Sequence, residues 1–160
     1  MQILLVRHGD AVLDSASDAT RPLSVLGEDQ SRIVGKAMMR LDLHPDIILC
    51  SPLLRARQMA AIIGEILTTS RIAASEYLVP GTDHRQLIDQ LNSFGLQTAL
   101  LVGHEPHLHN FLSLLTTDNQ DLEVHFGNGT LACADVRMPI HSGAGVLRFL
   151  MTVEHLGMMV

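Results

Sequence analysis

Residues 3–11 of the chain read ILLVRHGDA. Ile3–Val6 is a continuous apolar run, which is typical of a short buried strand. A cation, a titratable ring and a flexible hinge follow it at once, as Arg7, His8 and Gly9. In open α/β sheets, ligands bind beyond the carboxyl ends of the strands. The stretch therefore predicts both a core strand and a candidate functional site at its end.

The rest of the chain alternates apolar runs with helix-like segments. This alternation predicts a mostly parallel sheet with helices on both faces. The last two strands are joined across a Gly-containing turn at 142–145, so they can pair as a hairpin and make the sheet mixed. We expect one domain over residues 1–160, a three-layer α/β/α sandwich. The predicted strands are 3–6, 47–50, 73–79, 98–102, 130–138 and 146–154, and the predicted helices are 24–41, 52–67, 83–94 and 106–115.

Two serines are predicted to be helix N-caps. Ser24 precedes a segment with apolar residues on one face, and Ser51 is followed by Pro52, a residue favoured at the first helical position. On this reading Arg55 lies in the first turn of its helix.

Composition restricts the partners of the protein. The net charge is −6, which argues against a nucleic-acid surface, because such surfaces neutralise phosphates. No stretch approaches the roughly 20 apolar residues of a membrane span, and Met1–Val6 is too short for a signal peptide. Cys50 and Cys133 lie in apolar runs without CxxC spacing, as core residues of a reduced compartment do. We expect a cytoplasmic protein with no membrane or nucleic-acid partner.

Three predicted strands end in polar residues of one chemical type, within VRHG, CSPLLR and LVGHEP. If the strands are parallel, these ends meet at one edge of the sheet. Two guanidiniums and two imidazoles suit a dianionic phosphoryl group, because the planar fork of Arg matches phosphate oxygens. A helix N-terminus adds to the positive field. The residues gathered there are Arg7, His8, Arg55 and His104.

A neutral His8 can attack phosphorus directly and form a phosphohistidine. Gly9 lets the backbone approach the ligand closely, and His104 can donate to the equatorial oxygens. Because the transferred group resembles metaphosphate, positioning and charge stabilisation carry most of the catalysis. Each residue taken alone also fits a structural or solvated role. The hypothesis rests on three strand ends that carry the same chemistry.

The motifs RHG, SPLLRARQ and GHEP resemble the histidine phosphatase superfamily, which has the phosphoglycerate-mutase-like fold. The opening residues, with RHGDA, SD and RPLS, are similar to the SixA-type phosphohistidine phosphatases. The resemblance covers about residues 1–58 and 100–106.

The resemblance implies a role for each matching residue. His8 is the nucleophile that becomes phosphorylated, and Arg7, Arg55 and His104 form the phosphate pocket with Gly9. Arg21 lies near the site, although a role as a loop anchor is equally open, and Asp18 is a candidate acid or orienting group. The resemblance implies no metal and no cofactor.

The chain differs from many members of the superfamily in its candidate general acid, and this difference indicates the substrate. Many superfamily members supply a Glu general acid after the second helix, where this chain reads EYLVPGTDH, with Glu76 inside a predicted strand and only Asp83 following. An alkoxide leaving group needs that acid, whereas an imidazole can leave a phosphoramidate as a neutral molecule. We therefore expect a phosphatase acting on a phosphohistidine of a phosphotransfer protein. The alternatives are a small phosphomonoester phosphatase, with Asp18 or Asp83 as the acid, and a non-catalytic phospho-ligand binding module.

The other histidines and the Gly-containing segment at 126–130 are predicted to have no catalytic or metal-binding role. His107 and His109 follow each other at i, i+2 and so face different sides of a helix, which disfavours a shared metal. FGNGT at 126–130 lacks the Lys and the helix of a phosphate loop, so we predict a turn that leads into a strand. The other histidines are predicted to lie at the surface: His44, His84, His125, His141 and His155.

Overall fold

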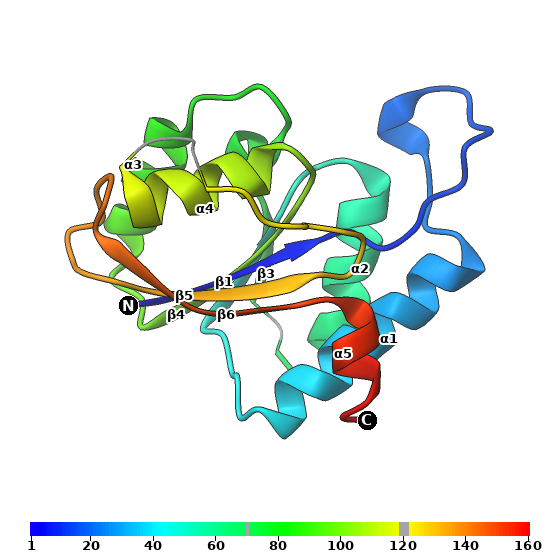
Figure 1. Ribbon diagram of the computed structural model, residues 1–160. Helices are drawn as coiled ribbons and strands as arrows, with labels where there is room; N and C mark the ends of the chain where they lie inside the picture. The colour runs from blue at the N-terminus through cyan, green and yellow to red at the C-terminus, as the bar shows by residue number, and fades with distance from the viewer. Residues whose placement is uncertain (70, 119–121) are drawn as a thin grey trace.

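The computed structural model describes residues 1–69, 71–118 and 122–160. Within these residues, six strands form one sheet in the order β3-β2-β4-β1-β5-β6 (Figure 1). The first four strands run parallel, and β5 and β6 run antiparallel to their neighbours. The sheet is therefore mixed, as predicted. The strands are β1 (Gln2–Arg7), β2 (Ile47–Cys50), β3 (Ile72–Ala74), β4 (Thr98–Gly103), β5 (Leu131–Val136) and β6 (Gly145–Met151).

Helices cover both faces of the sheet. Side chains of β1 alternate between the two faces, so Ile3 and Leu5 join one buried cluster while Leu4 and Val6 join the other. The first cluster is completed by α3 (His84–Phe94) and α4 (His107–Thr117), and the second by α1 (Val25–Arg40), α2 (Leu54–Ile66) and α5 (Val153–Gly157). The three-layer α/β/α architecture is confirmed.

Ser24 caps α1 as predicted, because its side-chain oxygen accepts the backbone N–H of Gly27 at 3.1 Å. The predicted cap at Ser51 is wrong. The helix α2 begins at Leu54, with Leu53 in the cap position. Ser51 instead accepts the N–H of Leu53 at 3.4 Å, which closes a turn before the helix. Arg55 still lies in the first turn of α2, so the helix N-terminus remains beside it.

Three predicted strands are longer than the observed ones. The strand expected over 130–138 spans Leu131–Val136. The strand expected over 73–79 ends at Ala74, and Glu76–Leu78 forms a short 3-10 helix. The strand expected over 146–154 ends at Met151, and α5 follows it. The apolar residues Val153 and Leu156 are buried in α5, where Leu156 joins the cluster beneath α1 and α2. Packing against helices, rather than sheet pairing, decides this last segment.

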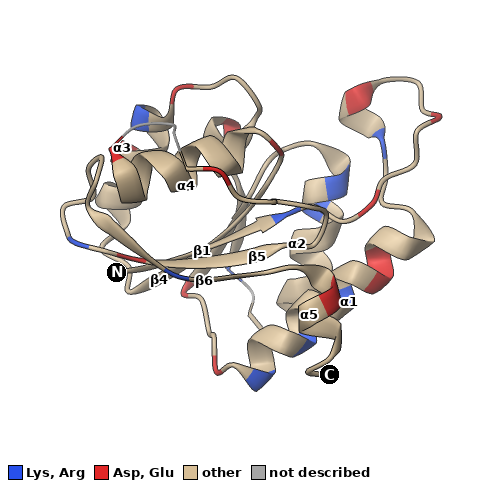
Figure 2. Ribbon diagram, in the orientation of Figure 1, with Lys and Arg blue, Asp and Glu red and all other residues tan. Residues whose placement is uncertain are grey.

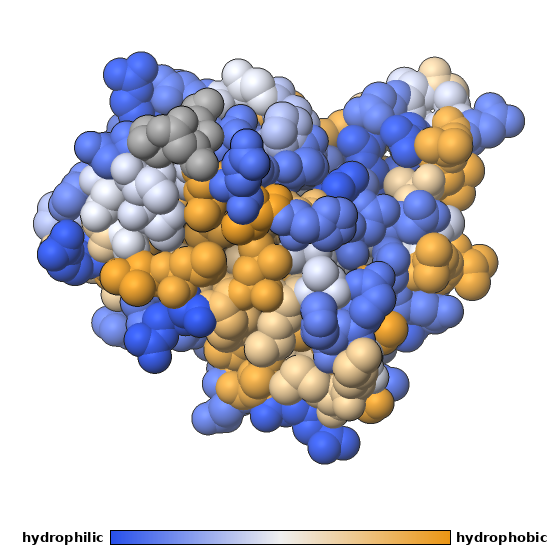
Figure 3. Space-filling view, viewed as in Figure 1, coloured by the Kyte–Doolittle hydropathy of each residue, from blue (hydrophilic) through white to orange (hydrophobic). Residues whose placement is uncertain are grey.

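The surface carries few large apolar side chains. Figure 3 shows the most continuous apolar area of this face over the edge strand β6, where Val146 is exposed. Cys50 and Cys133 are buried and unpaired, as expected for core residues. Among the described residues, no helix combines the length and apolar character that crossing a bilayer requires.

Candidate active site

The parallel register brings the predicted site residues to one edge of the sheet. Arg7 pairs with Gly103 across β1 and β4, and Cys50 of β2 pairs with Val102. His8 and His104 therefore follow directly from adjacent strands, and the start of α2 lies next to them. Figure 2 shows basic segments at the end of β1 and at the start of α2 on the same side of the molecule.

The two histidine rings and Arg55 are in direct contact. The ring centroids of His8 and His104 lie 4.9 Å apart, with the rings inclined by 60°. The Arg55 Nε–H donates to His8 Nε2 over 3.2 Å. His8 Nδ1 lies 2.7 Å from the Gly9 carbonyl oxygen, which can only accept a hydrogen bond. The proton of His8 is therefore on Nδ1, and the lone pair of Nε2 faces the site.

Both rings are neutral at pH 7. Burial is the main cause that lowers the pKa of His8 to about 4; the Gly9 carbonyl opposes this shift and the Arg55 charge adds to it. Burial, followed by the neighbouring His8, lowers the pKa of His104 to about 3. A neutral His8 keeps the lone pair that a nucleophile needs.

Arg7 approaches the same region from the end of β1. Its Nη1 donates to the Phe126 carbonyl over 3.0 Å, and its charge also lowers the pKa of His8, after burial and the Arg55 charge. Several buried polar atoms nearby have no hydrogen-bond partner within the described part of the chain: Arg7 Nε, His104 Nδ1 and His104 Nε2. A bound oxyanion is the kind of ligand that satisfies such clustered donors.

Asp18 and Arg21 belong to segment 11–22, which projects from the body of the protein (Figure 1). Asp18 reaches back to Arg55: its carbonyl accepts from Nη1 over 2.7 Å and its carboxylate from Nη2 over 3.1 Å. Arg21 donates to the carboxylate of Asp18 over 3.2 Å and to the carbonyl of Val12 over 2.8 Å. Arg21 thus anchors the segment, and its charge also helps to lower the pKa of His8, after burial and the charges of Arg55 and Arg7.

The carboxyl of Asp18 hydrogen-bonds Arg55 and is favoured in its ionised form. Burial works to raise the pKa of its carboxyl, but the hydrogen bonds and charges of Arg55 and Arg21 together lower it below the usual value. A carboxyl that stays ionised at pH 7 is a poor general acid.

The sequence profile of the histidine phosphatase superfamily (branch 1) matches residues 3–77. A curated relative, phosphohistidine phosphatase SixA of Escherichia coli (strain K12), is 34% identical over 110 residues, which are 66% of this chain and 68% of the relative. The chain belongs to the histidine phosphatase superfamily.

Solved structures agree with this assignment. The structure of the protein histidine phosphatase SixA complexed with tungstate superposes with a TM-score of 0.89 at 28% identity, over 98% of this chain and 99% of that one. The putative phosphohistidine phosphatase SixA from Agrobacterium tumefaciens has a TM-score of 0.78 at 22% identity, over 94% and 97% of the two chains, and supports the fold.

The first turn of α1 positions the RHG motif of this superfamily member, a contact that the sequence did not reveal. A Cβ added at Gly9 would lie 2.5 Å from the carbonyl oxygen of Gly27, and one added at Gly27 would lie 1.9 Å from that of Asp10. The two glycines therefore let the backbones touch. Ser24 holds the turn from the same helix end, since its N–H donates to the Asp10 carbonyl and its hydroxyl to the Asp10 carboxylate.

The other candidate acid lies apart from the cluster. Asp83 caps α3 by accepting the N–H of Arg85 at 2.9 Å, and that hydrogen bond, with the one from the Arg85 side chain, lowers the pKa of its carboxyl. No contact of Asp83 with His8 or His104 is found in the described residues.

The remaining histidines form other contacts. His107, which is buried, donates from Nε2 to the Tyr77 carbonyl over 2.9 Å, whereas His109 contacts Glu105 and the Leu122 carbonyl. They face different surroundings, as their spacing predicted. His84 is half-buried rather than at the surface, because its ring lies 4.3 Å from that of His107. Within residues 1–69, 71–118 and 122–160, no three His, Cys, Asp or Glu side chains gather as a metal site.

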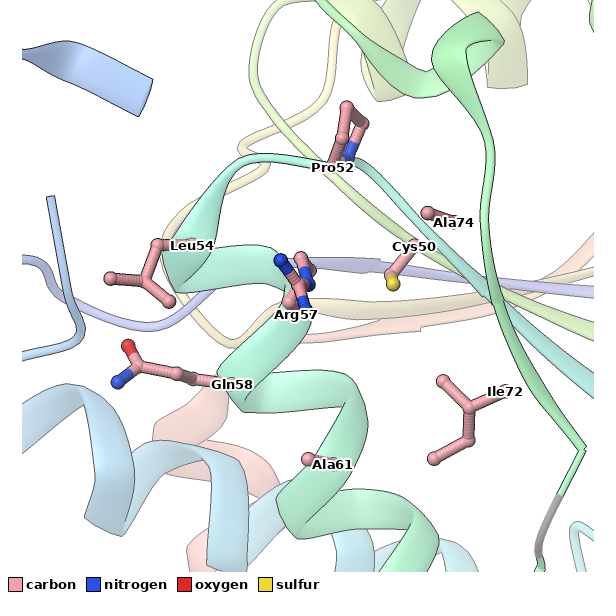
Figure 4. A pocket seen from close by; sticks show the side chains of 8 residues that line it. All are labelled: Cys50, Pro52, Leu54, Arg57, Gln58, Ala61, Ile72 and Ala74. Carbon is pink, nitrogen blue, oxygen red and sulfur yellow. The ribbon is translucent and has the colours of Figure 1, made fainter. Parts of the chain in front are cut away.

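A pocket of about 490 Å³ lies between α2 and the strands β2 and β3 (Figure 4). It shares none of its lining with the histidine cluster. Burial raises the pKa of the Cys50 thiol, so the thiol stays protonated and is a weak nucleophile. We therefore assign the chemistry to the cluster and not to this pocket. The lining residues are Cys50, Pro52, Leu54, Arg57, Gln58, Ala61, Ile72 and Ala74.

Proposed function

We propose that this protein is a phosphohistidine phosphatase that works through a phosphorylated His8. The observation that carries the proposal is the state of the His8 ring. Its Nδ1 proton is fixed by the Gly9 carbonyl, and its Nε2 lone pair faces Arg55 and the ring of His104. This is the arrangement of a nucleophile beside an oxyanion pocket.

In the first step, the phosphoryl group of the substrate binds among Arg7, Arg55 and His104. A phosphoryl oxygen takes over the N–H that Arg55 gives to His8, which frees the Nε2 lone pair. Nε2 then forms a bond to phosphorus while the bond from phosphorus to the substrate imidazole breaks. The substrate ring, protonated on its other nitrogen, leaves as neutral imidazole. The Gly9 carbonyl stabilises the positive charge that His8 gains, because it accepts the Nδ1–H.

In the second step, water attacks the phosphorus of phospho-His8. The bond between phosphorus and Nε2 breaks, and its electron pair returns to Nε2. Both protons of the water leave with the released phosphate, as H₂PO₄⁻. His8 is thereby restored as the neutral Nδ1–H form.

The choice of a nitrogen–phosphorus bond rests on the two candidate acids, Asp18 and Asp83. Cleavage of an alkyl phosphate gains about 10²–10⁴-fold from general acid catalysis. Asp18 and Asp83 both have lowered pKa values and hydrogen-bond to arginines. The resemblance to a relative named phosphohistidine phosphatase SixA supports the same choice.

The proposed substrate is a phosphorylated histidine-containing phosphotransfer protein, met in the cytoplasm. The histidine phosphatase SixA whose structure superposes at a TM-score of 0.89 is named as a protein phosphatase, which supports a protein as the substrate here.

The test is to trap the intermediate. After brief mixing with a ³²P-phosphohistidine protein and quenching in alkali, the wild type should carry label that acid removes, and His8→Ala should carry none. His44→Ala is the matched control, since His44 is exposed and contacts Asp42. An alkyl phosphate turned over much faster than phosphohistidine would refute the choice of substrate. Turnover that persists in His8→Ala would refute the mechanism.

A further inference from the structure

The segment Phe126–Thr130 lies against Arg7 on the side of β1 opposite His104. The sheet order places β1 between β4 and β5, and the segment leads directly into β5. The backbone N–H of Arg7 donates to the Thr130 carbonyl over 3.3 Å, and the N–H of Gly129 donates to the Arg7 carbonyl over 3.1 Å. With the bond from Arg7 Nη1 to the Phe126 carbonyl, the segment holds both the backbone and the side chain of Arg7.

The segment is a tight turn, as the sequence predicted, and the turn fixes where its side chains lie. The N–H of Thr130 donates to the Gly127 carbonyl over 3.1 Å, and Gly129 has φ 68°. Gly129 is favoured there because other residues rarely adopt positive φ. The register of β1 and β5 ends at Val6↔Leu131; beyond it, the Arg7 N–H donates to Thr130 while the Arg7 carbonyl accepts from Gly129, so residues 129 and 130 both lie opposite Arg7. These backbone hydrogen bonds hold Thr130 next to Arg7 in the chain fold.

Two polar side chains of this turn are buried without a partner. Thr130 is fully buried, and its hydroxyl oxygen makes no hydrogen bond to any described residue. The Asn128 Oδ1 is likewise buried and unpaired, as is Arg7 Nε next to them. A buried polar group without a partner destabilises a fold, and valine would fill the position of Thr130 without that cost. Polar groups retained at such cost beside a cationic pocket indicate that a ligand satisfies them.

We propose that Asn128 and Thr130 are further binding residues of the phosphoryl pocket, which complete it on the β5 side. The Thr130 hydroxyl donates to a phosphoryl oxygen. The two ends of the Asn128 amide interchange by rotation of the side chain, and the NH₂ end donates to the same group. The ligand is a tetrahedral oxyanion, and only this choice of ligand rests on the proposed function.

Binding of orthovanadate, a phosphate mimic, tests the proposal without any turnover. Isothermal titration of the full chain should show that Asn128→Asp, which places a carboxylate against the anion, raises the Kd at least thirtyfold. Thr130→Val should raise it about fivefold or more, and Thr130→Ser should restore it. Gln86→Glu adds the same charge as Asn128→Asp on the exposed side of α3 and should bind vanadate as the wild type does. If Asn128→Asp does not fold, Asn128→Ser takes its place, with an expected increase of about fivefold.

Thermal melting adds a readout that a merely structural role would not give. Without vanadate, Thr130→Val should have a Tm equal to or above that of the wild type, because an unpaired buried hydroxyl is removed. With vanadate, the ligand-induced rise in Tm should shrink. Thr130→Val that melts well below the wild type, or that binds vanadate normally, would overturn the role of Thr130. Wild-type affinity in the Asn128 variants, or a wild type that does not bind vanadate, would overturn the role of Asn128.

The outcome is separable from that of the proposed function. A protein that binds vanadate through Asn128 and Thr130 but does not hydrolyse phosphohistidine would refute the proposed substrate and keep this inference. Hydrolysis through phospho-His8 with unchanged vanadate binding in these variants would refute this inference and keep the proposed function.

Discussion

Gly27→Ala should inactivate the protein although Gly27 lies in a helix and carries no functional group. The added Cβ would lie 1.9 Å from the carbonyl oxygen of Asp10, where carbon–oxygen contacts normally require about 3.3 Å. The turn that holds His8 and Gly9 must therefore move by roughly 1.4 Å. A displacement of about 1 Å at a catalytic group costs about 10²-fold in rate.

The same clash sets the expected loss of stability. Overpacking costs about 1–3 kcal/mol, and the higher helix propensity of Ala offsets about 1 kcal/mol. A net loss of about 0–2 kcal/mol corresponds to a Tm lowered by at most about 8 °C for a chain of this size. The protein should therefore remain folded at 25 °C with kcat reduced about a hundredfold.

The assay is steady-state hydrolysis of a phosphohistidine substrate, with a thermal melt of each variant. Gly35→Ala is the control, because it makes the same change in α1 where the new Cβ meets the Ile66 side chain, with Cδ1 at 2.9 Å and Cβ at 3.3 Å, and no backbone of the RHG turn. Its kcat should stay within about twofold of the wild type. Gly27→Ala with wild-type kcat and Tm would show that the contact between α1 and the RHG turn does not position His8.

Three further predictions concern charge. Since the pKa of His8 is lowered to about 4, kcat/KM corrected for the titration of the substrate ring should be flat from about pH 8 to 5.5 and fall about tenfold per unit below pH 4, as His8 is protonated. A midpoint near pH 6.5 in the corrected profile would contradict a neutral buried ring. Burial also lowers the pKa of His104 to about 3 and of His107 to about 4. Below pH 6.5 the unfolded chain therefore binds more protons than the folded chain, and the Tm should fall steadily from pH 7 to pH 4. His107→Gln should make this dependence shallower, and a Tm that does not vary with pH would contradict the lowered pKa values. Arg55→Ala should abolish turnover with only a small change in Tm in melts at pH 7. It should also speed proteolysis within segment 11–22, because Arg55 holds that segment through its hydrogen bonds to Asp18. An unchanged cleavage rate would show that these hydrogen bonds do not hold the segment.

The site residues that could be predicted from the sequence are those that directly follow a predicted strand. Arg7, His8 and His104 follow apolar runs, and the parallel arrangement of such runs brings their ends together. Whether Asp18 serves as acid or orienting group could not be predicted, because its pKa depends on Arg55 and Arg21 reaching it in space. The contact of Gly27 with the RHG turn could not be predicted either. It joins two backbone segments that are distant in sequence, and no local sequence pattern indicates that they approach each other.

The fold shows the same division. Ser24 was predicted as a cap because its neighbours carry a regular helical pattern, whereas Ser51 shares the cap signature but closes a turn. The run that ends at Val153 continues the apolar character of β6, yet its last residues form α5 because Leu156 can be buried beneath α1 and α2. The local hydrophobic periodicity carries no information on the stability gained when Leu156 packs against other helices.

The position of β1 in the middle of the sheet has a consequence for folding. Its two neighbours, β4 and β5, come from the second half of the chain, so the strand that leads into His8 stays unpaired until distant segments have closed onto it. Such long-range closure is slow compared with helix formation. In a refolding experiment, recovered turnover should therefore lag behind recovered helical circular dichroism, and a nascent chain that has not yet emerged past residue 104 should be catalytically silent.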